Sequence, residues 1–98
     1  MSGWTFVTNH AVVLIYISRN PGARLREIAA YAGITERAVQ AIVRDLVDDG
    51  YLTATRVGRR NQYTVHFDTP MRHPTQRHRD VGELLDLLTK GAGVEAAT

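Results

Sequence analysis

The chain has 98 residues, of which 44% are hydrophobic and 22% charged, and this composition is ordinary for one small globular domain. It contains no cysteine, which excludes disulfide bonds and thiolate metal sites and fits a reducing compartment. The longest apolar run, residues 11–17, is too short to cross a bilayer, and residues 1–10 lack the pattern of a signal peptide. We therefore expect a cytoplasmic protein with a single domain over residues 1–98.

The net charge is only +2, but the positive charges are unevenly placed. Eleven of the twelve cationic side chains are arginine, and residues 50–79 contain six arginines against one acid, Asp68. Arginine pairs bidentately with phosphate oxygens, so this segment suits an anionic partner such as a nucleic acid. A solvated, arginine-rich surface would give the same composition, and charge alone does not separate the two interpretations.

A first helix is predicted from Thr8 or Asn9, either of which can cap it, to about Arg19. Its apolar residues cover most of the circumference, which is typical of a helix at the centre of a small core or at a subunit contact. The segment before it carries two large aromatic residues, Trp4 and Phe6, that are suited to pack on another surface.

Two further helices are predicted around a tight turn. Residues 25–32 have apolar positions at helical spacing, Gly33 can adopt the left-handed conformation that closes a helix, and Thr35 can cap the next one over residues 36–49. The third helix has one apolar stripe for the core. Its opposite stripe consists of Arg37, Gln40, Ala41 and Arg44. Residues 25–50 therefore read as a helix-turn-helix.

The remaining pattern predicts a hairpin and a last helix. Residues 53–57 and 62–67 have the composition of strands, and Gly58-Arg59-Arg60-Asn61 is a turn signal between them. A leucine-rich helix is expected over residues 76–89. The predicted fold is mostly α with a small β-hairpin, a winged helix-turn-helix with its wing at about residues 52–67 and an additional C-terminal helix.

The segments LREIAAYAGITERAVQAIVRDLVDDGYL and TATRVGRRNQYTV resemble the winged-helix transcription regulators of bacteria, of the MarR and ArsR type. The resemblance implies a DNA-binding transcription regulator. No Ser-His-Asp set, Gly-rich phosphate loop or paired-carboxylate motif stands out, so no enzyme is expected. Leu25 departs from the family pattern, which often has Ser or Thr at the start of the second helix. The missing cysteines argue against the metal sensing of many ArsR-type regulators.

The residues expected to contact DNA combine the exposed stripe of the third helix with the hairpin tip. Arginine can pair with guanine, glutamine with adenine, and a small side chain can touch a thymine methyl group. Arginines on a hairpin can contact phosphates or the minor groove. The candidates are Thr35, Arg37, Gln40, Ala41, Arg44, Arg56, Arg59, Arg60 and Asn61.

Each of these residues also has a structural explanation that does not involve DNA. The stripe can be a solvated polar face, Arg44 can pair with Asp48 one turn further on, and a charged hairpin tip can simply aid solubility. The four histidines, His10, His66, His73 and His78, show no spacing typical of a metal site, and no cofactor motif is found.

The expected partners are double-stranded DNA and a second copy of the chain. The first and last predicted helices carry more apolar surface than a small winged core requires. A homodimer is therefore predicted through Leu84, Leu85, Leu88 and part of the first helix. The sequence also allows a winged-helix module that binds a protein instead of DNA. A ligand-responsive regulator is a third hypothesis, and any small-molecule effector is unknown.

Overall fold

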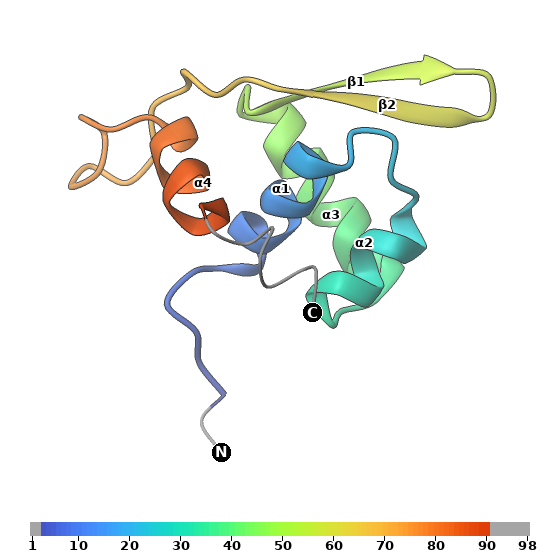
Figure 1. Cartoon of the computed structure of the whole chain (residues 1–98), viewed down its shortest axis with the longest axis horizontal. Helices are drawn as coiled ribbons and strands as arrows, with labels where there is room; N and C mark the ends of the chain where they lie inside the picture. Colours follow the sequence, from blue (N-terminus) through green and yellow to red (C-terminus); the bar gives the residue numbers. More distant parts are fainter. Residues whose placement is uncertain (1–2, 91–98) are drawn as a thin grey trace.

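The structure is a computed structural model that describes residues 3–90, so residues 1–2 and 91–98 of the predicted domain lie outside it. The helices and strands are α1 (Asn9–Arg19), α2 (Leu25–Ala32), α3 (Glu36–Asp48), β1 (Leu52–Val57), β2 (Arg60–Val65) and α4 (Val81–Thr89). In Figure 1, α1 lies between α4 on one side and the α2–α3 pair on the other, and the hairpin extends beyond the helices. This confirms the predicted mostly helical fold with a small hairpin. No helix within residues 3–90 is long and apolar enough to span a membrane.

Helix α1 is the centre of the core. It packs against α2, α3, α4 and β2, and its residues Val13, Leu14, Ile15 and Ile17 are buried. A helix contacted on several sides needs apolar residues around most of its circumference, which explains the pattern in its sequence. Of the two roles that this pattern allowed, α1 fills the central one.

The turn between α2 and α3 depends on one glycine. Gly33 has a φ angle of +72°, and its N–H donates to the carbonyl oxygen of Ala29 at 2.8 Å, which closes α2. Ile34 follows, half-buried against the core, and the Thr35 hydroxyl accepts the N–H of Ala38 at 3.0 Å to start α3. The glycine that ends α2, the isoleucine packed on the core and the threonine cap together fix the angle between α2 and α3.

The change Gly33→Ala should therefore lower the free energy of unfolding by about 1 kcal/mol, because an L-residue is strained at a positive φ. Chemical denaturation followed by circular dichroism measures this loss. Gly3→Ala is the control, since Gly3 has open space around it and no positive φ. An unchanged stability in Gly33→Ala would contradict the strained turn.

The hairpin differs from the prediction at its turn. β1 and β2 pair antiparallel with Val57 opposite Arg60 and Arg56 opposite Asn61, so the connection is only Gly58 and Arg59. Gly58 takes a φ of +64°, which lets two residues close the ladder. Arg60 and Asn61, predicted to lie in the turn, are paired strand residues, and β2 ends at Val65 instead of residue 67.

The last helix begins later than predicted, at Val81 instead of about residue 76. The Asp80 carboxylate accepts the N–H of Glu83 at 3.0 Å, and the Glu83 carboxylate accepts the N–H of Asp80 at 3.1 Å. This reciprocal cap sets the start of α4, and residues 74–78 form turns instead of a helix.

Two contacts hold the chain that follows the wing, one from the start of α4 and one from the residue before β1. The Gly82 N–H donates to the Phe67 carbonyl oxygen at 2.8 Å, and a Cβ on Gly82 would lie only 2.6 Å from that oxygen. The Tyr51 hydroxyl donates to the Pro70 carbonyl at 2.6 Å. Burial raises the pKa of the Tyr51 phenol, so this hydroxyl keeps the proton that it donates.

Candidate nucleic-acid interface

The predicted polar stripe of α3 is exposed. Its members are Arg37, Gln40, Ala41 and Arg44. On the opposite side of the same helix Val39, Ile42 and Leu46 are buried in the core, so the helix presents one face inward and the other to solvent. Thr35 is exposed at the start of the helix, but its hydroxyl oxygen serves as the cap of α3.

The ion pairs leave the arginine stripe available. Among residues 3–90 the side-chain ion pairs are His10–Asp45 at 2.8 Å, Arg72–Asp49 at 3.5 Å and Arg79–Glu83 at 2.6 Å. Arg44 belongs to none of them, so the alternative pairing with Asp48 is not found. Two acids in the second half of α3 and just beyond it instead contact side chains of other segments: Asp45 contacts His10 of α1, and Asp49 contacts Arg72 of the loop before α4.

A recess of about 400 Å³ lies between the start of α2 and the wing. Four arginines line it, and no acidic residue of the described chain does. The lining residues are Ala23, Arg24, Leu25, Arg56, Arg59, Arg60, Asn61 and Tyr63. The structure thus gathers the four predicted wing residues at one place and adds a fourth arginine, Arg24, from the α1–α2 connection.

Arg24 was absent from the sequence-based candidates because it is separated from the wing by more than thirty residues of sequence. It occupies the N-cap position of α2, where its backbone N–H donates to the Glu27 carboxylate at 2.8 Å. Its guanidinium has no acceptor atom and cannot cap the helix, unlike a Ser or Thr side chain. An arginine at this unusual position was the signal in the sequence that could have pointed to the recess.

The wing is braced against the α1–α2 connection. The Arg60 guanidinium donates to the carbonyl of Gly22, and the backbone N–H of Tyr63 donates to the carbonyl of Pro21 at 2.9 Å. Arg56 donates to the Gly58 carbonyl at 3.1 Å, within the wing itself. Arg60 therefore holds the wing in place as well as contributing positive charge to the recess.

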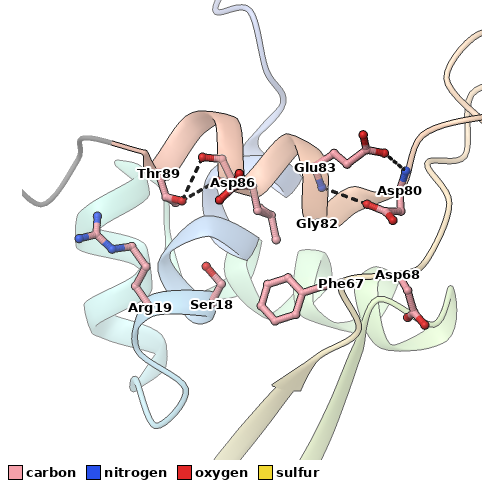
Figure 2. Close-up of a pocket in the computed structure, with 10 residues that line it drawn as sticks. Ser18, Arg19, Phe67, Asp68, Asp80, Gly82, Glu83, Asp86 and Thr89 are labelled. Atoms are coloured by element: carbon pink, nitrogen blue, oxygen red, sulfur yellow. Dashed lines mark hydrogen bonds between the residues drawn. The ribbon is translucent and has the colours of Figure 1, made fainter.

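A second hollow, of about 580 Å³, has the opposite charge (Figure 2). It lies between the end of α1, the chain after β2 and α4. Its charged lining residues are Arg19, Asp68, Asp80, Glu83 and Asp86. The pKa of Glu83 is lowered, first because the Asp80 N–H donates to the carboxylate and second because the Arg79 guanidinium does. Four carboxylates would repel phosphate, so this side of the molecule is unsuited to a nucleic acid.

The leucines predicted at a subunit contact differ in their exposure. Leu85, expected at a subunit contact, is only 2% exposed and belongs to the core of its own chain, so that part of the prediction is wrong. Its neighbours differ: Leu84 is half-buried, Leu88 is exposed, and Leu87, which was not among the predicted contact residues, is 71% exposed. Within residues 3–90, no group of three or more His, Asp or Glu side chains is placed to hold a metal ion.

Comparison with known proteins gives a consistent result. The sequence model of the MarR family matches residues 4–60. The HTH-type transcriptional regulator PetP of Rhodobacter capsulatus is 33% identical over 57 residues, which make up 58% of this chain and 34% of PetP. The chain therefore spans about a third of the length of this curated relative.

A solved structure supports the fold. The crystal structure of the antimony-specific transcriptional repressor AntR matches with a TM-score of 0.54 at 22% identity, over 90% of this chain and 69% of that chain. The similarity extends past the family match to the region of α4 and supports the same arrangement of helices and hairpin.

Proposed function

Because the chain belongs to the MarR family, we propose that it is a transcription regulator that binds double-stranded DNA. The observation that carries the proposal is the recess between α2 and the wing, with four arginines and no acid. Phosphate groups bind where arginines converge without competing carboxylates. The names of the relatives, a transcriptional regulator and a transcriptional repressor, agree with this function.

In the proposed complex, α3 enters the major groove. Arg37 and Gln40 lie in its first two turns, where side chains of a recognition helix reach base edges, and they read guanine and adenine. Ala41 touches a thymine methyl group, and Thr35 contacts the backbone beside the helix start. Arg44 lies one turn further on, free of an ion pair, and reaches either a base or a phosphate.

The wing holds the DNA backbone in this proposal. Arg24, Arg56 and Arg59 supply charge to a phosphate in the recess, and Asn61 contributes an amide donor. Arg60 adds charge while it braces the wing on Gly22. The base contacts determine sequence preference, and the recess contributes affinity that does not depend on sequence.

We further propose that the protein acts as a homodimer. The exposed leucines of α4, Leu87 and Leu88, with the half-buried Leu84, form an apolar strip beyond the core. A two-fold dimer would place two copies of α3 in successive major grooves. Leu85 is excluded from this contact because its side chain is already buried.

Selection of bound sequences from random duplex DNA, at several salt concentrations, tests the proposed function. A specific regulator enriches one site, and with a dimer that site is palindromic. The alternative, a winged helix that binds protein, predicts no affinity for DNA at any salt concentration. Uniform weak binding with no enriched sequence would overturn the proposed base recognition by α3.

The recess itself is tested by the changes Arg24→Ala and Arg59→Ala. Each should weaken binding to every sequence alike. Each should also make the negative slope of log affinity against log salt concentration shallower by about 1, because one phosphate contact is lost. Arg19→Ala is a matched control, since Arg19 is an exposed arginine that lines the acidic hollow. If Arg19→Ala has the same effect as Arg24→Ala, general charge and not the recess governs affinity.

A further inference from the structure

Two large aromatic side chains stand almost uncovered at the start of the chain. Phe6 is 94% exposed and Trp4 is 65% exposed, and their rings meet edge to face with centroids 5.1 Å apart. Figure 1 shows that the segment before α1 runs away from the helices. Neither ring contacts the core, although burial of such a ring is strongly favourable.

An apolar pocket of about 370 Å³ opens close to the base of this segment. It lies between α1, the end of α3, the loop before α4 and α4 itself. Seven aliphatic side chains and the ring of Tyr51 line it, and the aliphatic ones are Ala11, Leu14, Leu46, Met71, Val81, Leu84 and Leu85. The other lining residues are polar, and four of them are engaged with one another in the His10–Asp45 and Arg72–Asp49 contacts. Its chemistry therefore fits an uncharged ring.

We infer that Trp4 and Phe6 of one protomer occupy this pocket in a second copy of the chain. The inference rests on the proposed homodimer and names a contact that the leucines of α4 do not supply. Leu84 belongs both to the pocket and to the apolar strip of α4. The docked segment before α1, here called the arm, and the strip therefore form one continuous surface. In a two-fold dimer the exchange is reciprocal, and each pocket receives the other protomer's aromatic pair.

The area involved is sufficient for a specific contact. Burial of both aromatic pairs, together with a similar area of the surfaces that they cover, would remove about 1,200 Å² from solvent, the lower end of specific interfaces. The leucine strip of α4 adds to this. Without the arms, only a few exposed leucines would hold the two copies together.

The experiment uses the fluorescence of Trp4, the only tryptophan in the sequence, together with sedimentation of the full chain. As the concentration rises from nanomolar to high micromolar, Trp4 emission should shift to shorter wavelength and iodide quenching should fall. Both changes should follow the concentration range in which sedimentation shows the dimer. Phe6→Ser should raise the dimer dissociation constant by roughly 100-fold, because two phenyl rings lose their burial.

Two variants test whether dimerisation depends on this pocket or on exposed apolar surface in general. Ala11→Phe fills the pocket from α1 and should keep Trp4 accessible to iodide at all concentrations. Val57→Ser removes an exposed apolar side chain of the wing, 61% exposed, and should leave dimerisation unchanged. Equal weakening by Val57→Ser and Phe6→Ser would overturn the inference.

The remaining outcomes are also decisive. A concentration-independent blue emission would show that the arm docks on its own chain, and a dimer with accessible Trp4 would show that the arm plays no part. Either result overturns the inference. Binding to the selected DNA site is measured on the same samples: if it persists with an accessible Trp4, the proposed function stands and only the arm contact fails. A dimer with a buried Trp4 but no affinity for DNA would overturn the proposed function and support the arm contact.

Discussion

Replacement of Leu85 by alanine is expected to lower the free energy of unfolding by about 3 kcal/mol, since it leaves a cavity between α4 and α1. For a domain of this size the unfolding temperature should fall by more than about 10 °C. The same change at Leu87 should alter the stability by less than about 0.5 kcal/mol. Both leucines belong to α4 and lose the same atoms, but Leu85 is 2% exposed and Leu87 is 71% exposed.

Urea unfolding followed by circular dichroism, repeated at several protein concentrations, measures the difference. The loss caused by Leu85→Ala should be the same at every concentration, because the contact lies within one chain. Any effect of Leu87→Ala should appear only where the protein is dimeric. Equal losses in both variants at the lowest concentration would mean that α4 turns a different face to the core.

The double change Arg37→Ala with Gln40→Ala is expected to lower affinity for the selected DNA site by roughly 100-fold. Each bidentate base contact is worth about 1–3 kcal/mol of discrimination, and the variant loses two of them. Affinity for random duplex DNA should fall by less than about tenfold, because only one positive charge is removed. The variant should therefore lose its sequence preference before it loses DNA binding.

Fluorescence anisotropy with the selected site and with random DNA, at one fixed salt concentration, gives both affinities. Asp48→Ala is the matched control, because Asp48 is exposed on the same helix but lies in its last turn. It should leave the preferred sequence unchanged. A parallel loss on both DNAs in the double variant would show that α3 contributes charge only and reads no bases.

The helices of the core could be predicted because their signals are local. The spacing of Val39, Ile42 and Leu46 identifies the buried face of α3 without knowledge of the rest of the chain. Gly33 and Thr35 mark the turn through their own conformational and capping properties. The exposed stripe with Arg37 and Gln40 follows directly, as the opposite face of the same helix.

Most of the errors concern features that depend on distant parts of the chain. The start of α4 is an exception, because its signal is local: Asp80 and Glu83, three residues apart, form the cap that starts the helix, and the prediction overlooked this pattern. Leu85 and Leu87 are alike in the sequence, and only the position of α1 decides which one is buried. Arg24 joins the wing arginines because Pro21 and Gly22 pair with β2, a contact that no spacing rule indicates.

The brace between the wing and the α1–α2 connection has a thermodynamic consequence. A free two-stranded hairpin would lose conformational freedom when it met DNA, and that loss would weaken binding. Here the bonds from Arg60 to Gly22 and from Tyr63 to Pro21 order the hairpin during folding. The arginines of the recess are then held near one another before any phosphate arrives. Their mutual repulsion is already overcome in the folded protein, so in the proposed complex each phosphate contact would contribute its charge pairing with little reorganisation.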